Sequence, residues 1–240
     1  MRTAVTDRTL IVNADDFGRS AAINRGVMRA SERGIVTSAS LMVRWPAAEA
    51  AAELGRERGL AVGLHFDLGE WEYRDGGWRA VYEVPESETP DSIERELADQ
   101  LERFERLVGR GPTHLDSHQH VHRDQPARGV VLRAGERLGV PVRHFSPEVS
   151  YSGAFFGQDG KGNPFPEAIT GDALVSVIEA LPPGVTELAC HPAAEAEGQS
   201  VYDSERVVEV ESLCDGRVRE AIERCGIALR SFANFAHEAA

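Results

Sequence analysis

The chain has 240 residues, of which 42% are hydrophobic and 27% are charged, ordinary values for a globular protein. No apolar run approaches the ~18 residues of a membrane-spanning helix. The 39 acidic and 26 basic side chains give a formal charge of -13, which disfavours nucleic acid and anionic membranes as partners and favours a small neutral or cationic substrate.

Strand patterns alternate with helical patterns about seven times along the chain. The expected strands are 8–13, 35–43, 60–66, 113–116, 140–145, 186–191 and 227–232, and the expected helices are 20–33, 46–57, 90–108, 125–138, 166–181 and 204–225. Two segments rich in aromatic residues and glycine, 67–89 and 149–165, show no clear period, and we expect them to be long loops over a site.

This alternation predicts an α/β fold of parallel strands, either open and covered on both faces or closed into a barrel. No linker separates regions of different composition, so we expect a single domain over residues 1–240. The three cysteines lack CxxC spacing, which argues against a disulfide framework or a cysteine zinc cluster. Residues 1–8 contain no apolar segment leading to a cleavage site, so we expect no secretory signal and a cytoplasmic location.

Polar side chains stand at the carboxyl ends of five expected strands: Asp15, Asp16, His65, His118, Arg143 and His191. Core packing gives no reason for such a gathering, and the carboxyl ends of parallel strands meet at the edge where active sites lie. The adjacent Asp15 and Asp16 repel each other unless a cation or a shared proton relieves them. Taken alone, that pair fits a solvated helix cap equally well; the histidines favour a functional site.

One aspartate and two histidines from separate strands form a ligand set that suits a divalent metal such as zinc. The spacing of His118, His120 and His122 puts them on one side of the chain, where at most one or two can face the metal, and His118, nearest the strand, is the expected ligand. His120 and His122 are expected to support the ligands or the structure.

With a metal bound, one carboxylate would ligate it while the other takes a proton from metal-bound water, as amide hydrolysis requires. His191 is the candidate general acid for the leaving amine, because imidazole titrates near neutral pH, and a strand-end cap is the alternative. Aromatic residues in the loops, such as Trp71, Phe156 and Tyr202, could contact a sugar ring, pack within the loops or form a homodimer interface. No glycine-rich Lys loop, GxSxG or GxGxxG motif is present, which removes the commonest nucleotide-binding and serine-hydrolase readings.

Five stretches of the chain resemble the YdjC-like carbohydrate deacetylases, a family that includes diacetylchitobiose deacetylase: 11–18, 34–38, 63–65, 112–122 and 190–192. The resemblance runs in order from residue 8 to about residue 232. It implies a distorted (β/α) barrel resembling polysaccharide deacetylases, one divalent metal ion (magnesium or zinc), and hydrolysis of N-acetyl groups on an amino sugar or short N-acetylated oligosaccharide.

Carried over position by position, the resemblance makes Asp16, His65 and His118 the metal ligands, Asp15 the base and His191 the acid. The expected substrate-binding residues, some of them in a late family motif, are Arg143, Trp71, Phe156, Tyr202, Asp203 and Arg206. Glu205 replaces the proline of that motif, and residues 66–70 depart from the usual run, so the sugar stays open.

Two other functions fit the same residues. A metal-dependent phosphoesterase or sugar isomerase keeps the barrel and the metal, although no basic cluster for phosphate lies beside the strand ends. A non-catalytic sugar-binding protein on the same scaffold would lack a ligand, the base or the acid, and none is missing.

Overall fold

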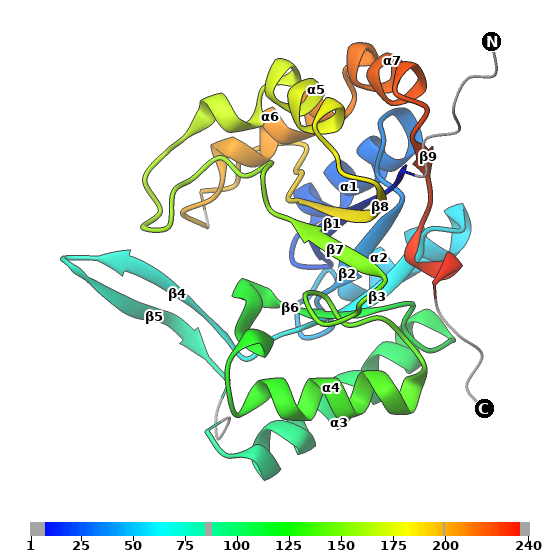
Figure 1. The fold of residues 1–240 in the computed structure, drawn as a ribbon. Helices are drawn as coiled ribbons and strands as arrows, with labels where there is room; N and C mark the ends of the chain where they lie inside the picture. The colour runs from blue at the N-terminus through cyan, green and yellow to red at the C-terminus, as the bar shows by residue number, and fades with distance from the viewer. Residues whose placement is uncertain (1–7, 85–87, 199, 236–240) are drawn as a thin grey trace.

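The computed structural model describes residues 8–84, 88–198 and 200–235, and its main sheet is parallel throughout. The strands of that sheet are β1 (Arg8–Phe17), β2 (Ser38–Leu41), β3 (Ala61–Phe66), β6 (Leu115–Ser117), β7 (Val149–Ser152), β8 (Gly184–Cys190) and β9 (Ala228–Leu229). Their order is β6-β3-β2-β1-β8-β7, with β9 paired to the start of β1. The sheet curls into an incomplete barrel (Figure 1), which confirms the predicted fold class.

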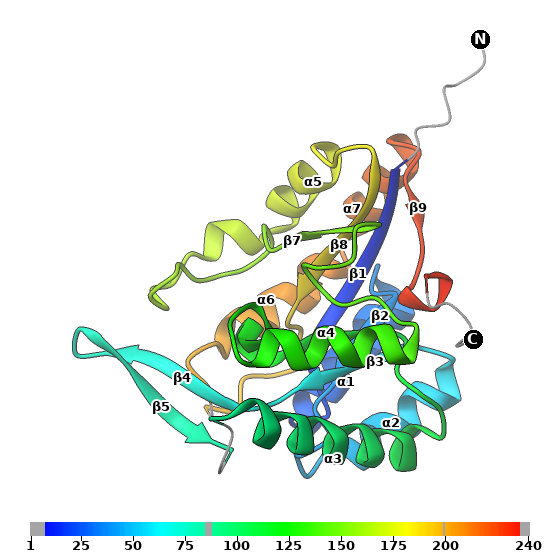
Figure 2. The same cartoon turned by 60° about the horizontal axis from the view of Figure 1, so that its bottom comes forward.

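Helices cover the outer face of the curled sheet (Figures 1 and 2). They are α1 (Ala21–Arg33), α2 (Ala48–Arg58), α3 (Pro90–Val108), α4 (Ala127–Leu138), α5 (Gly171–Glu179), α6 (Ser204–Leu213) and α7 (Gly216–Arg224), with short 3-10 turns η1 (His118–Arg123), η2 (Pro166–Ile169) and η3 (Phe232–Asn234). Helix α3 confirms its predicted bounds: Thr89 caps its first turn, apolar residues recur along its buried face, and Gly109 ends it with a φ of 78°. No helix in the described parts of the chain is long and apolar enough to cross a membrane.

The two faces of β1 differ in chemistry. Leu10 and Val12 point outward into the main hydrophobic core, whereas Ile11 belongs to a small cluster with Val149 and Phe232 inside the curl. Farther along the inner face, the amide of Asn13 donates hydrogen bonds to Ser40 and Asp15. The interior of the barrel is therefore apolar near the start of β1 and polar near its carboxyl end.

Segment 67–89 was expected to be a loop, but most of it forms an antiparallel hairpin, β4 (Gly69–Arg74) and β5 (Gly77–Glu83). Asp75 and Gly76 make the two-residue turn, with φ values of 50° and 80°. Asp-Gly is a strong hairpin signal that the sequence contains. In Figures 1 and 2 the hairpin projects from the sheet on the same side as the yellow-green segment before α5.

Other expected elements differ as well, among them the helix 166–181, which is divided into η2 and α5 at Thr170, the N-cap of α5. Within 140–145 only Val142 forms a bridge, to Leu115, because the chain then turns back: Phe145 and Ser146 both donate to the carbonyl of Val142. The edge strand is instead β7, inside segment 149–165. The expected single helix 204–225 is interrupted at Asp215, which caps α7.

Candidate metal centre and active site

A β-bulge near the end of β1 brings two adjacent carboxylates to one side of the strand. Ala14 pairs with Ala39 and Phe17 with Leu41, so β1 carries one extra residue between these pairs. In a regular strand, neighbouring side chains point to opposite faces. Asp16 has a φ of 63°, and Asp15 and Asp16 both line the same cavity.

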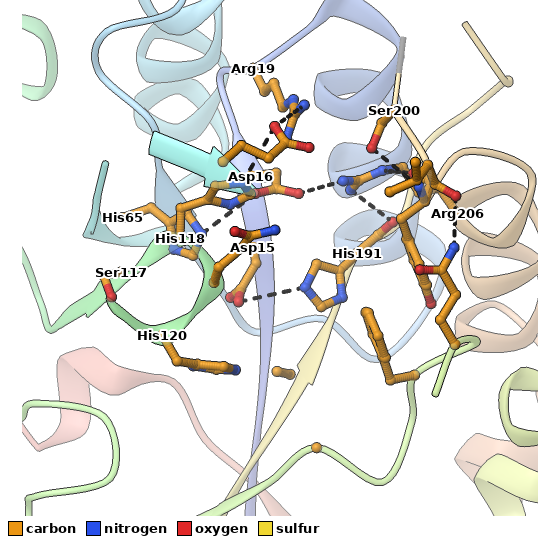
Figure 3. Close-up of a pocket in the computed structure, with 18 of the residues that line it drawn as sticks. Asp15, Asp16, Arg19, His65, Ser117, His118, His120, His191, Ser200 and Arg206 are labelled. Carbon is orange, nitrogen blue, oxygen red and sulfur yellow. Dashed lines mark hydrogen bonds and ion pairs between the residues drawn. The ribbon is translucent and has the colours of Figure 1, made fainter. Parts of the chain in front are cut away.

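That cavity has a volume of about 350 Å³ and lies at the carboxyl end of the sheet (Figure 3). It brings together five of the predicted site residues, which come from β1, β3, the start of η1 and the end of β8: Asp15, Asp16, His65, His118 and His191. Of the expected substrate-binding residues, Phe156, Tyr202 and Arg206 also line it.

Asp16 and two histidines present their ligand atoms to one another. Oδ1 of Asp16 lies 3.1 Å from Nδ1 of His118 and 3.5 Å from Nε2 of His65. These three residues can place one ligand atom each within 4.8 Å of the others. All three are buried, and Oδ1 of Asp16 accepts no well-formed hydrogen bond from the described residues. An orphaned buried carboxylate oxygen between two imidazoles fits a divalent metal ion.

The orientation of the His65 ring is fixed by a carboxylate on the side away from Asp16. Its Nδ1 donates to Oδ1 of Asp116 at 2.8 Å, which leaves Nε2 directed at Asp16. A carboxylate behind a histidine commonly fixes the orientation of a metal ligand. Burial by itself lowers the pKa of His65, but the negative charges of Asp116 and Asp15 outweigh it and raise the pKa to about 10. The same negative charges favour a cation at this position.

The second oxygen of Asp16 is bound by an arginine. Oδ2 accepts a hydrogen bond from Arg206 at 2.5 Å, and Nε of Arg206 donates to the carbonyl of Tyr202 at 2.7 Å. Burial favours the neutral form of Asp16, yet the charges of Arg206 and His118 hold its pKa well below the ordinary value. Asp16 is therefore ionised, and α6 fixes its carboxylate.

Asp15 is held by a different arginine. Nη1 and Nη2 of Arg143 each donate to one of its carboxylate oxygens at 2.7 Å, and Asn13 donates to Oδ1 at 2.9 Å. Burial would raise the pKa of Asp15, but the Arg143 guanidinium outweighs burial and leaves the pKa below its ordinary value. Asp15 therefore stays ionised in a fixed orientation.

Arg143 was expected to bind substrate, but it is not among the described residues that line the cavity. Its side chain is 0% exposed and is enclosed by three carboxylates: Asp15, Asp116 at 2.8 Å and Glu187 at 2.6 Å. Its hydrogen bonds are therefore directed at buried acids. Arg143 instead positions Asp15, and the carbonyl of Arg143 accepts a hydrogen bond from Nε2 of His122 at 3.1 Å.

His191 lies opposite the two aspartates. Its Nε2 is 3.8 Å from Oδ2 of Asp15, and its Nδ1 faces Glu209 at 3.9 Å without a well-formed hydrogen bond to the described residues. Glu209 also accepts hydrogen bonds from the backbone amide of His191 and from the hydroxyl of Tyr202. Burial lowers the pKa of His191 to about 4 and raises that of Glu209 to about 8, so near neutral pH His191 is neutral and Glu209 carries a proton.

The remaining predicted residues occupy varied positions. The ring of His120 lines the cavity and contacts the hydroxyl of Tyr151 at 3.2 Å, so it forms part of the wall and does not lie behind the ligands. The backbone of Trp71 is bound to the side chain of Gln119, and Asp203 accepts hydrogen bonds from the amides of 197 and 198. Neither Trp71 nor Asp203 is among the described residues that line the cavity.

Sequence reasoning assigned no role to five charged residues of this region: Arg19, Glu70, Asp116, Glu187 and Glu209. Glu187 lies within the apolar strand β8, and a carboxylate in such a strand is a sign of a buried ion pair. Glu70 falls in the stretch that departs from the family pattern. Arg19 and Glu209 give no local signal, because helices and turns commonly carry exposed charges.

Comparison with known proteins places the chain in a family. The family model described as "YdjC-like protein" matches residues 9–224. A carbohydrate deacetylase of Geobacillus stearothermophilus is 36% identical over 250 residues, covering 95% of this chain and 98% of the relative. A solved structure of a putative cellobiose-phosphate cleavage protein from Enterococcus faecalis V583 is similar with a TM-score of 0.78 and 26% identity, over 96% of this chain and 99% of that one.

A more distant structure, of a peptidoglycan N-acetylglucosamine deacetylase, has a TM-score of 0.60 and 12% identity, over 95% of this chain and 87% of that one. That likeness concerns the fold. The match of the family model and of the curated relative spans nearly the whole chain, and it includes the bulged strand and the histidines described above. The chain belongs to the YdjC-like protein family.

Proposed function

We propose that this chain is a metal-dependent carbohydrate N-deacetylase, which hydrolyses the N-acetyl group of an amino sugar or a short N-acetylated oligosaccharide. The observation that carries the proposal is the orphaned Oδ1 of Asp16 between His65 and His118, in one cavity with an ionised Asp15 and with His191. The 36% identical relative named carbohydrate deacetylase supports the same activity.

Asp16, His65 and His118 would hold the metal ion. One oxygen and two nitrogen ligands suit zinc better than magnesium, which prefers oxygen ligands. A divalent metal bound there supplies a Lewis acid that polarises the amide carbonyl and makes water more acidic. Arg206 and Asp116 keep two of the three ligands in orientation.

Asp15 is the proposed general base. It is ionised, lies next to Asp16 in the bulge and is held at both oxygens by Arg143, so it can accept a proton from the attacking water without moving. Its lowered pKa makes it a weak base in the resting enzyme, and this is sufficient when the water is already acidified.

His191 is the proposed acid that protonates the leaving amine. Its Nε2 faces Asp15 and the cavity, and its other nitrogen faces the protonated Glu209. A histidine with a pKa near 4 is neutral at rest, so the proton must reach it during the reaction, and Asp15 at 3.8 Å is the nearest group that gains one. Return of the proton from Asp15 through His191 to the amine closes the cycle.

Two aromatic rings form a wall for the sugar. Phe156 and Tyr202 are stacked with ring centroids 4.5 Å apart and an interplanar angle of 1°, and both rings contact His191. Aromatic faces of this kind pack against the C–H face of a pyranose while the polar groups of a cavity bind its hydroxyls.

The test is acetate release from N-acetylglucosamine oligomers, with and without a chelator, by the wild-type protein and Asp15→Asn. We expect turnover that stops with the chelator, returns with added zinc and is lost in Asp15→Asn. Asp99→Asn, an exposed position on α3, is the matched control and should behave as wild type. Turnover that continues unchanged in the presence of the chelator, or full activity of Asp15→Asn, would reject the proposal.

The predicted single domain, cytoplasmic location and homodimer stay predictions. The carboxylates of Asp15, Asp16 and Glu70 in the cavity wall are each paired with an arginine, and no lysine or further arginine among the described residues lines the cavity, so nothing specific supports the phosphoesterase alternative.

A further inference from the structure

One guanidinium nitrogen of Arg19 has no partner among the residues that the structure describes. The residue follows the turn at Gly18, and its side chain is only 8% exposed. Nη2 donates to Oε2 of Glu70 at 2.6 Å, and the guanidinium lies over the ring of Trp45 at 4.9 Å. Nη1 meets no acceptor among the described residues, although Arg19 lines the cavity. A buried donor left unpaired is costly, which points to an acceptor on a ligand.

Glu70 places an acceptor beside this donor. It comes from β4, its side chain is 6% exposed, and it also lines the cavity. Oε2 of Glu70 is 3.6 Å from Nε2 of His118, one of the proposed metal ligands. The Arg19–Glu70 pair therefore borders the metal centre, and Figure 3 shows Arg19 above Asp16 on the cavity wall.

The chemistry of the pair selects its ligand. The charge of Arg19 is already compensated by Glu70, so the pair offers no excess positive charge to an anionic group such as a phosphate. A hydroxyl group both donates and accepts a hydrogen bond. Adjacent hydroxyls on a sugar ring can therefore accept from Arg19 and donate to Glu70 at the same time.

We propose that Arg19 and Glu70 bind hydroxyl groups of the sugar ring beside its N-acetyl group and so determine which neutral amino sugar is deacetylated. This inference rests on the proposed function and names the substrate class of the same site: an unphosphorylated sugar with free ring hydroxyls. Trp45 and the hydrogen bond to Glu70 hold the guanidinium in place, so the donor is oriented before the sugar arrives.

The experiment compares wild type, Arg19→Lys and Glu70→Gln on the N-acetylglucosamine disaccharide and on its monodeoxy analogues, each lacking a single hydroxyl. Lysine keeps the positive charge but loses the planar fork, and glutamine keeps the shape but loses the charge. We expect each variant to lose about 10- to 100-fold in kcat/KM on the parent sugar, mainly through KM. Arg25→Lys, on the exposed side of α1, should leave KM unchanged.

One deoxy analogue should reveal the partner. In wild type, removing the hydroxyl that the pair binds should lower kcat/KM by about the same factor as the protein substitution does. In the variants, removing that hydroxyl should not lower kcat/KM further. The inference would be overturned if the losses in kcat/KM from the substitution and from the missing hydroxyl multiplied for every analogue, or if KM were unchanged in both variants. The pair would then have only a structural role, connecting the hairpin to the turn after β1. A phosphorylated sugar preferred by wild type would overturn it as well.

Binding separates this inference from the proposed reaction. Calorimetry on Asp15→Asn protein with zinc, with and without Arg19→Lys or Glu70→Gln, measures sugar affinity without turnover. We expect Arg19→Lys and Glu70→Gln to lower the affinity for the parent sugar about 10- to 100-fold, and to have no effect on the affinity for one of the deoxy analogues. This result supports sugar binding by the pair even if wild type releases no acetate. In that case only the proposed deacetylation is rejected. Equal affinity in all proteins that keep their wild-type melting temperature rejects the pair.

Discussion

Asp15 and Asp16 are consecutive in β1, yet each carboxylate faces the same cavity and is bound by a different arginine. Arg143 binds Asp15 from inside the barrel, and Arg206 binds Asp16 from α6. The bulge makes this possible, because a regular strand would turn one of the two side chains into the hydrophobic core. Two chemically identical groups thereby acquire different surroundings, and their single variants should fail in different ways.

Asp16→Asn should lose the metal. An amide is a weaker ligand than a carboxylate, and asparagine also leaves the charge of Arg206 uncompensated. We expect metal content below one-tenth of the wild-type value after dialysis, a level consistent with the loss of a metal ligand, and no acetate release. Added zinc should raise the melting temperature of wild type and not of the variant, since only a protein that binds the ion gains stability from it. Wild-type metal content in Asp16→Asn would contradict its role as a ligand.

Asp15→Asn should keep the metal and lose turnover. Asp15 lies outside the group of Asp16, His65 and His118. It belongs to a second group that could hold an ion, with His65 and Asp116, but Arg143 binds both of these carboxylates, so metal content should match wild type. Removal of a general base costs about 100- to 10,000-fold in kcat. Metal analysis and acetate release on one protein preparation check both statements, and loss of metal together with activity would show that Asp15 is itself a ligand.

Arg143→Lys should reduce kcat while leaving the metal in place. Arg143 binds three buried carboxylates through four hydrogen bonds and one further ion pair. A lysine ammonium is a point charge that cannot bind both oxygens of Asp15 in this way. Because an uncompensated buried charge remains, we expect a loss of about 3 kcal/mol in the free energy of unfolding and at least a tenfold loss in kcat. Denaturant unfolding and kinetics measure the two; an effect on KM alone would instead support substrate binding by Arg143.

The alternation of strands and helices was sufficient to predict the parallel sheet, because both periodicities are local properties of the chain. Segment 140–145 has the composition of a strand, but only Val142 pairs with the sheet, through its bridge to Leu115. The chain turns after Val142, whose amide donates to the hydroxyl of Ser146. The hairpin in 67–89 was not predicted, although the pair Asp75 and Gly76 is typical of a two-residue hairpin turn. Both errors concern turn chemistry, which outweighs strand propensity over short segments.

The site was predictable to the extent that it depends on strand ends. Asp15, Asp16, His65, His118 and His191 meet in the cavity because parallel strands all present the same end. Their partners were not predictable: Arg143 lies 128 residues from Asp15 and Arg206 lies 190 residues from Asp16. Such pairings depend on the register of distant strands and helices, which no local pattern encodes.

Glu209 should make stability fall as pH rises. Its pKa is raised by burial from an ordinary value of 4.5 to about 8, so between these pH values the folded protein binds a proton that the unfolded chain has released. Unfolding therefore becomes easier as pH rises through this window, and Glu209→Gln removes this dependence. The melting temperature of Glu209→Gln relative to wild type should increase from pH 5 to pH 8 and then level off.

The matched control for this comparison is Glu211→Gln, at an exposed position on the same helix, whose melting temperature should follow wild type at every pH. Glu187, with a pKa raised to about 7, adds a similar dependence to all three proteins and cancels in the differences. A difference between Glu209→Gln and wild type that stays constant with pH would show that Glu209 is ionised in the folded protein throughout.

Gly26→Ala should damage both stability and activity. Gly26 lies in α1, where an added Cβ would come within 2.4 Å of Cα of Ala193, two residues beyond His191. Backbone atoms cannot move aside as a flexible side chain does, so we expect a loss of about 1–3 kcal/mol in the free energy of unfolding and a lower kcat through displacement of His191. Gly129→Ala, also within a helix, meets its neighbours at an ordinary 3.5 Å and should be neutral or stabilising. Denaturant unfolding and acetate release compare the two variants, and equal behaviour would show that α1 and the chain after His191 are not tightly packed.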